Sequence, residues 1–349
     1  MVIGIIGAGL SGLIAGKILS QGGHDVTVFE KSNALEGRLA TRQYGENHKN
    51  IVDIHSSCIY AHDPVFMEFI NELTDKGILK VWAHSFPYHD GEELFDSYPG
   101  HEKSDYYYAP EGLDKVGEYL TRWVDTEYNE KVGGFTFIGD KRHSKKAWMM
   151  NLTNFNVYEM DAIIVATPAI QAYGLIQTSQ DETSIRKLIR DLDQVTYDNS
   201  ISLIAGYGDR DLPEWKAIQC RDQGVEWIIN DSSKRDNPEE LTLVIQSTNR
   251  FFHKYHKESD EKISQLLLKR VNNIVENDWI DQPDWVVVEQ WRYRKPRNPL
   301  DVPFLEIDRA ENDGPLALIG DYLSGNSIES AYLSGYKLAK HWLEKFPAK

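Results

Sequence analysis

The residues just after the N-terminus have the types and spacing of a turn that binds phosphate. Glycines stand at positions 7, 9 and 12, so the chain reads Gly-x-Gly-x-x-Gly after a short apolar run. Such glycines permit a tight turn and let the backbone approach a pyrophosphate, and the N–H groups that open the next helix attract negative charge. An acid about twenty residues later would accept hydrogen bonds from an adenosine ribose. The predicted contacts are Gly7, Ala8, Gly9, Leu10, Ser11 and Gly12 in the turn, with Glu30 and Lys31 near the ribose.

The segments around this turn predict the elements that must position it. An apolar run, Val2–Ile6, precedes the glycines, an amphipathic stretch follows them, and Asp25–Phe29 reads as a second strand that ends at Glu30. This order of strand, turn, helix, strand and acid is the context that the glycine pattern requires. It predicts a dinucleotide site on a Rossmann-type sheet, and by itself it is compatible with NAD as well as FAD.

Two segments beyond the turn favour FAD over NAD. Gly37 and Arg38 follow the second strand, where another phosphate-facing loop needs a glycine for close approach and a guanidinium for charge. The alternative for Arg38 is an ordinary salt bridge at the surface. An apolar strand at 161–165 then ends at Thr167 and Pro168, which would return the chain to the nucleotide-binding sheet.

The C-terminal region supplies the third segment that favours FAD. A predicted strand ends at Gly320 and Asp321, and a helix with small residues at its start follows from Ser327 and Ile328. The positive end of that helix dipole would favour an electron-rich ring. An aspartate at the end of a strand could equally cap a helix.

Together these residues give the chain a resemblance to the bacterial renalase-like enzymes among the flavin amine oxidoreductases. It includes the Gly37–Arg42 loop, the Val165–Pro168 turn, Glu226–Lys234 with its Asn-x-Ser-Ser-Lys sequence, and Gln290–Tyr293 with its Trp-Arg-Tyr sequence. The resemblance implies noncovalent FAD, with Arg38 at the diphosphate and Asp321 at the ribityl chain. It also implies that a 2- or 6-dihydro isomer of NAD(P) passes a hydride to flavin N5, and that O2 reoxidises the flavin and gives H2O2.

The same resemblance implies the fold class and the domains. We expect an α/β protein in which a Rossmann-type FAD-binding domain is interleaved with an α+β substrate domain, as in flavin amine oxidases. The FAD-binding domain is expected to take residues 1–60, 157–172 and 315–349. The substrate domain is expected to take residues 61–156 and 173–314.

One segment departs from the family it resembles. Where the family usually reads Asp-Leu-Gly-Ala-Gln-Tyr-Phe, this chain has Asp53–Ile59, with His55, Ser57 and Cys58 among the changed positions. A side chain in place of glycine changes the space beside the cofactor, so the departure bears on the substrate more than on the fold. Covalent attachment of the flavin at His55 or Cys58 is a minor alternative.

Other substrate-pocket candidates come from the two more specific motifs. Lys234 and Arg292 are candidate contacts to an anionic substrate or to the flavin, and Trp291 and Tyr293 are candidate walls. Salt bridging and core packing are equally reasonable roles for these residue types. The candidates are therefore His55, Ser57, Cys58, Lys234, Trp291, Arg292 and Tyr293, with no dedicated acid or base assigned.

Composition restricts the partners. The net charge of −16 over 349 residues opposes binding to nucleic acid or to an anionic membrane, and neither partner is expected. The eleven histidines and two cysteines show no ligand spacing, so no metal site is predicted. With two cysteines, no leader before the first strand and no apolar run of membrane length, we expect a cytoplasmic protein with a small-molecule substrate.

Two other functions remain open from the sequence. The His55–Cys58 departure favours an amine oxidase, or a dehydrogenase of a specialised amine or cyclic metabolite. A non-catalytic module that binds flavin or a nucleotide and senses redox state is the non-enzymatic alternative. The intact Gly37-Arg38 and Gly320-Asp321 pairs argue against loss of cofactor binding.

Overall fold

The computed structural model describes residues 1–35, 37–45, 49–100, 104–139, 146–178, 184–221, 224–307 and 314–348. Two compact units make up the chain, and each is assembled from separated stretches of sequence. Unit 1 comprises Met1–Leu39, Val116–Tyr197 and Lys295–Lys349. Unit 2 comprises Ala40–Lys115 and Asp198–Arg294.

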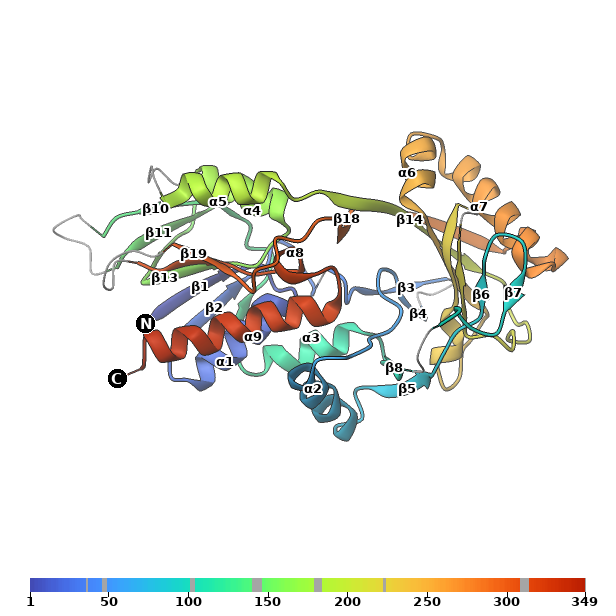
Figure 1. Ribbon diagram of the computed structural model, residues 1–349, viewed down its shortest axis with the longest axis horizontal. Coiled ribbons are helices and arrows are strands. Elements are labelled where there is room, and N and C mark those ends of the chain that lie inside the picture. The colour runs from blue at the N-terminus through green and yellow to red at the C-terminus, as the bar shows by residue number, and fades with distance from the viewer. Residues whose placement is uncertain are drawn as a thin grey trace. The chain divides into compact units, whose positions relative to one another are not determined.

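A six-stranded sheet forms the centre of unit 1 (Figure 1). Its strands lie in the order β19 (Leu305–Ile307), β20 (Leu316–Leu318), β13 (Ala162–Val165), β1 (Val2–Ile6), β2 (Asp25–Phe29) and β9 (Asp125–Glu127). All neighbours are parallel except β19 and β20. The parallel pairing of β13 with β1 confirms that the strand predicted at 161–165 returns the chain to the sheet of the glycine turn. Parallel strands buried on both faces explain the continuous apolar runs of β1 and β13.

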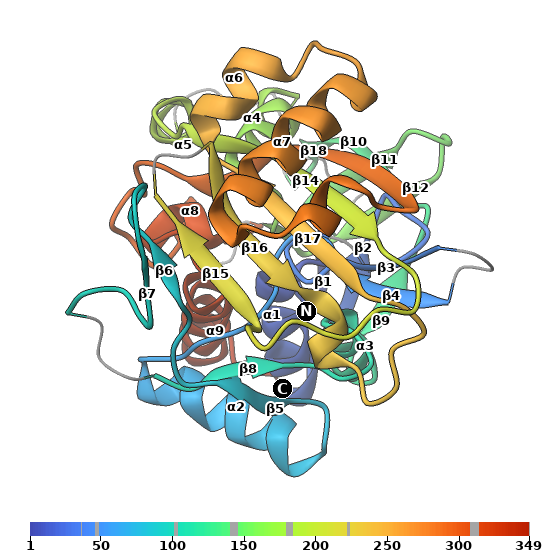
Figure 2. The same cartoon turned by 90° about the vertical axis from the view of Figure 1, so that its right-hand side faces the viewer.

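Helices and a small sheet complete unit 1. The helices are α1 (Leu10–Gln21), most of α3 (Asp114–Thr121), α4 (Ala169–Gln177), α5 (Ser184–Asp193), α8 (Asp321–Ser324) and α9 (Ile328–Lys345). Helices α1 and α9 run side by side (Figures 1 and 2). They approach closely because Gly335 has no side chain: a Cβ there would lie 2.2 Å from the Ser11 carbonyl oxygen. The antiparallel sheet consists of β10 (Val132–Phe137), β11 (Trp148–Leu152) and β12 (Val157–Met160).

A seven-stranded sheet forms the centre of unit 2. Its order is β18 (Trp285–Pro296), β14 (Tyr197–Gly206), β17 (Thr242–Ser247), β16 (Val225–Asn230), β15 (Ala217–Cys220), β6 (Tyr88–His89) and β7 (Leu94–Phe95). Helices α6 (Asn249–Tyr255) and α7 (Asp260–Val275) cover one face, where Leu203 and Leu243 meet Leu267 (Figure 2). The opposite face carries Ile204 and Val244, because successive side chains of a strand alternate between faces.

Smaller elements complete unit 2. They are β3 (Thr41–Tyr44), β4 (Asn50–Asp53), α2 (Pro64–Asp75), β5 (Lys80–Ala83), β8 (Tyr106–Tyr108) and two 3-10 helices, η2 (Asp231–Lys234) and η3 (Asp278–Asp281). Helix η3 packs through Ile280 on the face that α7 covers, whereas β3, β4, β5 and β8 contribute side chains to the opposite face. Aromatic side chains from several elements gather here. We call this group the aromatic face, and its members are Trp82, Phe86, Tyr106, Trp227 and Trp291.

The boundaries of the two units differ from the predicted domain boundaries. Residues 40–60 group with unit 2, because β3 and β4 form a hairpin and Asp53 has its polar partners there. Residues 116–156 group with unit 1, since β9 pairs with β2. Which unit binds cofactor and which binds substrate stays a prediction at this point. None of the helices in the described part of the chain combines the length and apolar character that crossing a bilayer requires.

Candidate functional site

The glycine turn of unit 1 has the geometry that the sequence predicts. Gly7 lies between β1 and α1 at φ +109°, and a Cβ there would lie 2.9 Å from the Ala166 carbonyl oxygen. Gly12 packs still more tightly, with the Gly7 carbonyl oxygen 2.2 Å from a built Cβ. A Cβ on Gly9, by contrast, would meet no described protein atom within 4 Å. Gly7 and Gly12 therefore serve the packing of the turn, while the space beside Gly9 is open to a ligand.

Glu30 closes the turn from the end of β2. Its side chain is buried, and Oε2 accepts a hydrogen bond from the Ala8 backbone N–H at 3.0 Å. Oε1 accepts one from the Ser32 backbone N–H at 3.1 Å. A buried carboxylate with two backbone donors is held rigidly at the edge of the sheet. Lys31, the next residue, is exposed.

Arg38, predicted at the diphosphate, and Asp321, predicted at the adjoining ribityl chain, form an ion pair within unit 1. Asp321 opens α8 and is buried, while Arg38 is one-fifth exposed. Burial raises the pKa of the Asp321 carboxyl, and the Arg38 guanidinium opposes that rise. The ion pair brings the Gly37–Arg38 loop and the strand end at Gly320–Asp321 to one place.

The remaining cofactor candidates also lie in unit 1. Thr167 follows β13, and its hydroxyl is buried with no partner among the described residues. Ser327 caps α9 by accepting a hydrogen bond from the Ser330 N–H at 3.1 Å, and Ile328 begins that helix. Gly37 has φ +92°, and a Cβ there would meet no described atom within 4 Å.

These residues fit a bound FAD. Open space beside Gly9 and Gly37 suits the close approach of phosphates, and the N-terminus of α1 offers unpaired N–H groups. Glu30 offers carboxylate oxygens for ribose hydroxyls, and Asp321 offers the same for a polyol chain. Every predicted cofactor contact thus belongs to one unit, and the glycine turn, Glu30 and Thr167 follow the carboxyl ends of its parallel strands, where such sheets bind ligands.

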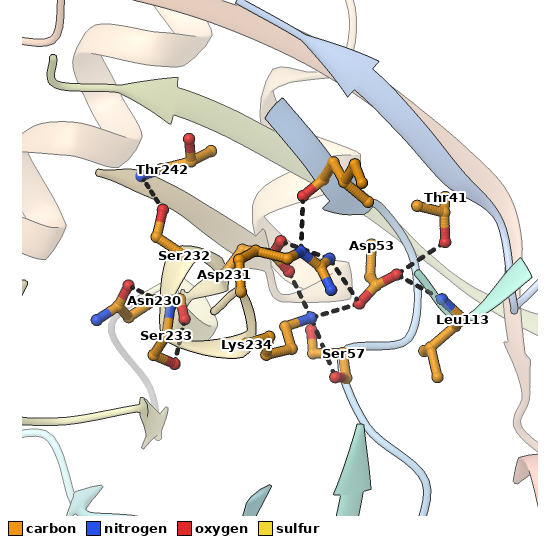
Figure 3. A network of polar contacts seen from close by, with 12 residues as sticks. Thr41, Asp53, Ser57, Leu113, Asn230, Asp231, Ser232, Ser233, Lys234 and Thr242 are labelled. Carbon is orange, nitrogen blue, oxygen red and sulfur yellow. Dashed lines mark hydrogen bonds and ion pairs between the residues drawn. The ribbon is translucent and has the colours of Figure 1, made fainter. Parts of the chain in front are cut away.

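Unit 2 holds a buried network of charges around Asp53. Figure 3 shows the Asp53 carboxylate with Thr41 and Leu113 on one side and Lys234 on the other. Oδ1 accepts from the Thr41 hydroxyl at 2.8 Å and from the Leu113 N–H at 2.9 Å. Oδ2 accepts from Lys234 Nζ at 2.6 Å and from the Arg235 guanidinium at 3.3 Å. Burial alone would raise the pKa of Asp53, but the two cations outweigh it and hold that pKa below its usual value.

Lys234 lies at the centre of this network and is fully buried. Its ammonium group pairs with Asp53 and with Asp231, and it donates to the Ser57 carbonyl oxygen at 3.2 Å. Since an ammonium has three N–H donors, all three are directed at protein oxygens. This arrangement differs from the predicted contact with an anionic substrate or flavin, because no donor is left for a ligand.

Three further substrate-pocket candidates, Trp291, Arg292 and Tyr293, are consecutive residues of β18. Trp291 lies on the aromatic face, where its ring meets the His55 ring edge-on at a centroid distance of 4.7 Å. Arg292 is exposed and points to the other side of β18, because side chains alternate along a strand. Tyr293 is partly buried on the side of Trp291. Trp291 is thus half-buried on the aromatic face, while Arg292, the next residue along β18, is exposed.

Ser57 and Cys58 lie beside the charged network. The Ser57 hydroxyl is buried and has no hydrogen-bond partner among the described residues. Burial raises the pKa of the Cys58 thiol to about 12, although the Lys234 charge acts in the opposite direction. A thiol with so high a pKa is a poor nucleophile at neutral pH.

Sequence reasoning missed three members of the network. Asp53, Asp231 and Arg235 received no role, although Asp231 pairs with both Lys234 and Arg235 at helical spacing within and after η2. Charged residues three and four positions apart after an apolar strand were a signal that could have suggested ion pairs. The partner Asp53 had no such local signal. In the described residues, no group of three or more His, Cys, Asp or Glu side chains is arranged to hold a metal ion.

Comparison with known families identifies both the turn and the larger architecture. Residues 5–73 match the NAD(P)-binding Rossmann-like domain. Residues 95–341, more than half of the chain, match the family described as flavin containing amine oxidoreductase.

Solved structures share the fold across the whole chain. Wild-type putrescine oxidase bound to putrescine has a TM-score of 0.75 at 13% identity, and the match covers 99% of both chains. Cyclohexylamine oxidase from Brevibacterium oxydans IH-35A has a TM-score of 0.74 at 10% identity, again over 99% of both chains. At these identities the likeness establishes the fold: a Rossmann-like domain combined with an amine oxidase domain.

Curated relatives match over shorter stretches. A 4-hydroxybenzoate brominase (decarboxylating) of Pseudoalteromonas luteoviolacea (strain 2ta16) is 29% identical over 175 residues, which are 48% of this chain and 26% of that protein. An uncharacterised protein of Methanocaldococcus jannaschii is 54% identical over 44 residues, which are 13% of this chain and 11% of that protein. The chain therefore spans about a quarter or less of the curated relatives that it matches.

Proposed function

Because the chain belongs to the family of flavin-containing amine oxidoreductases, we propose that it is an FAD-dependent oxidoreductase of a small molecule. FAD is the cofactor of this family, and unit 1 holds the residues that would bind it. Gly9 and Gly37 would face the diphosphate, Glu30 the adenosine ribose and Asp321 the ribityl chain. Arg38, which pairs with Asp321, would neutralise negative charge of the diphosphate.

The proposed substrate is a 2- or 6-dihydro isomer of NAD(P), as in the renalase-like enzymes that the chain resembles. The choice rests on the resemblance of Asn230–Lys234 and Trp291–Tyr293 to the renalase-like enzymes, and on the position of Trp291 on the aromatic face of unit 2. Aromatic rings bind a flat ring by stacking or by edge-on contact. When bound, FAD supplies the hydride-accepting chemistry, and O2 is the proposed final acceptor.

This chain's own side chains would bind and orient the substrate. Trp291 and His55 offer ring faces and edges, while the ammonium of Lys234 stays in its internal ion pairs. A dihydropyridine donates a hydride without prior loss of a proton. The proposal therefore requires no dedicated base, and the high pKa of the Cys58 thiol agrees with it.

An amine is the second candidate substrate. The observation in its favour is the full-length likeness in fold to putrescine oxidase and cyclohexylamine oxidase. The His55–Cys58 departure from the renalase-like pattern points the same way.

Rapid-mixing absorbance of the flavin decides between the candidates. The holoenzyme is mixed without oxygen with the 2- and 6-dihydro isomers of NAD(P), and in parallel with putrescine and cyclohexylamine. We expect a dihydropyridine isomer to bleach the flavin within about 0.1 s, the time of a turnover at a typical median rate. Faster bleaching by an amine would replace the first candidate by the second. Purified protein that takes up no FAD would refute both.

A further inference from the structure

Four charged side chains are buried together in unit 2. Asp53 and Lys234 have no exposure, Asp231 has 1% and Arg235 has 10%. Burying charges costs free energy unless each charge is paired, and here every charge is. The two negative and two positive charges cancel, and the cluster is closed to solvent. It therefore does not serve as a surface for a charged ligand.

The network holds backbone from separate parts of unit 2. Arg235 donates to the carbonyl oxygens of Ile51 at 3.1 Å and Ala109 at 2.7 Å, and Asp53 accepts from the Leu113 N–H. These contacts join β4 to the segment that leads into α3. Lys234 adds a different connection, because its ammonium donates to the carbonyl oxygen of Ser57.

Ser57 belongs to the segment His55–Cys58, where the sequence departs from that of the family the chain resembles. Two side-chain donors hold carbonyl oxygens of this segment: Gln246 Nε2 lies 2.6 Å from the His55 oxygen, and Lys234 Nζ lies 3.2 Å from the Ser57 oxygen. Gln246 is itself bonded to the buried Arg294 at 2.9 Å. Each end of the segment is thus fixed by a side chain that belongs to a larger polar network.

We propose that Lys234 is a positioning residue for the substrate: it holds Ser57 and thereby determines where His55 and Cys58 lie on the aromatic face. The inference rests on the proposed function in one respect, since it takes the His55–Cys58 segment to face the substrate. Lys234 acts through Ser57 and does not touch the substrate, because its three donors are already used. Selectivity would then depend on a residue that no ligand contacts.

The test is a charge-balanced double variant, Lys234→Met with Asp231→Asn. It removes one positive and one negative charge, so Asp53 and Arg235 remain as a pair at 3.3 Å. The Ser57 carbonyl oxygen loses its donor. The control is Lys80→Met, which breaks an exposed ion pair with Asp236 at 3.9 Å in the same unit. Both are made with Cys220→Ala, which leaves Cys58 as the one thiol of the chain.

Two measurements follow on the FAD-loaded proteins. The first is the rate at which an aromatic disulfide reagent labels Cys58, which the raised pKa of the thiol keeps slow in the parent. The second is KM and kcat for whichever substrate bleaches the wild-type flavin. In the double variant we expect labelling at least tenfold faster and a KM raised about tenfold, with kcat changed less than threefold. The Lys80→Met control and the conservative Lys234→Arg variant should stay within twofold of the parent in both measurements.

Other outcomes overturn the inference. Unchanged labelling together with an unchanged KM would mean that the lysine is only an ion-pair partner. Unchanged labelling with a KM raised solely for anionic substrates would mean direct contact with the substrate. Should the double variant fail to fold, Lys234→Gln with Asp231→Asn is measured instead, because the Gln amide keeps two N–H donors for the three acceptors. Should no substrate bleach the wild type, the proposed function fails, and the labelling rates alone decide whether Lys234 holds the segment.

Discussion

Lys234 Nζ lies 2.6 Å from Oδ2 of Asp53, and neither side chain has any exposure to solvent. The two residues are 181 positions apart in the sequence, so this single ion pair joins β4 to η2 across unit 2. Breaking a buried ion pair by removing one partner costs about 3–5 kcal/mol, because the other charge is left in a medium of low polarity. Removal of either partner alone is therefore expected to destabilise unit 2.

Asp53→Asn should lower the free energy of unfolding most at neutral pH. The folded-state pKa of Asp53 lies below its unfolded value, so its stabilising effect is complete above the unfolded pKa of about 3.9. The effect is lost as the pH falls from there through the folded pKa. Urea unfolding of wild type and variant between pH 3 and 7 should thus give curves that converge at acidic pH. A difference that is constant over this range would contradict the assigned ionisation.

Gly9→Val should remove FAD binding without harming the fold of the apoprotein. A Cβ at Gly9 meets no described protein atom within 4 Å, so the side chain would occupy space that the pyrophosphate needs. Gly12→Ala is the matched comparison, because its Cβ would lie 2.2 Å from the Gly7 carbonyl oxygen and should cost about 1–3 kcal/mol of stability. Melting of the apoproteins and FAD content after reconstitution separate the two effects. A Gly9→Val protein that keeps its FAD would place the diphosphate elsewhere.

Glu30→Ala should weaken FAD binding by about 1.5–3 kcal/mol, the value of hydrogen bonds to a charged acceptor. The same variant also removes the acceptor for the Ala8 N–H, so the turn itself loses a contact. Glu30→Gln keeps an acceptor oxygen for Ala8 and should lose less. Equilibrium dialysis of FAD against wild type, Glu30→Ala and Glu30→Gln ranks their affinities for FAD. Equal affinity in all three would refute a ribose contact at this position.

Arg38→Met should make FAD retention sensitive to pH. Burial already raises the pKa of Asp321, and Arg38 is the cation that opposes the rise, so its loss lets Asp321 take up a proton at a higher pH. A protonated carboxyl is a weaker acceptor for a ribityl hydroxyl. We expect the affinity of the variant for FAD to fall as the pH is lowered, by about 1.5–3 kcal/mol in total, while the affinity of wild type changes less. Asp321→Asn has no carboxyl to protonate, so its affinity for FAD should not depend on pH. The same pH dependence in wild type, Arg38→Met and Asp321→Asn would rule out the role of the ion pair in FAD retention.

The amino-acid sequence by itself determined the glycine turn of unit 1 and the elements that hold it. The glycine turn, Glu30 and the strands on either side are consecutive in the chain, and their hydrogen bonds and packing follow from local geometry. A glycine at a position with φ +109° or against a carbonyl oxygen at 2.2 Å is a local necessity, so spacing alone revealed it. The position of β13 beside β1 was also predicted, from an apolar strand that ends at a turn of small residues, and the parallel pairing of the two strands confirms it.

Only the tertiary structure decided which distant charges and rings meet. Asp53 pairs with Lys234, and Arg38 pairs with Asp321, although no periodicity or spacing connects them. The same holds for His55 and Trp291, whose ring contact depends on how the segment after β4 lies against β18. Local propensity acts over a few residues. A buried charge without a partner is so costly that it is paired in the folded state, and the partner can be distant in the sequence. Of the two roles that the sequence left open for Lys234, its three partners therefore favour the internal ion pairs over a substrate contact.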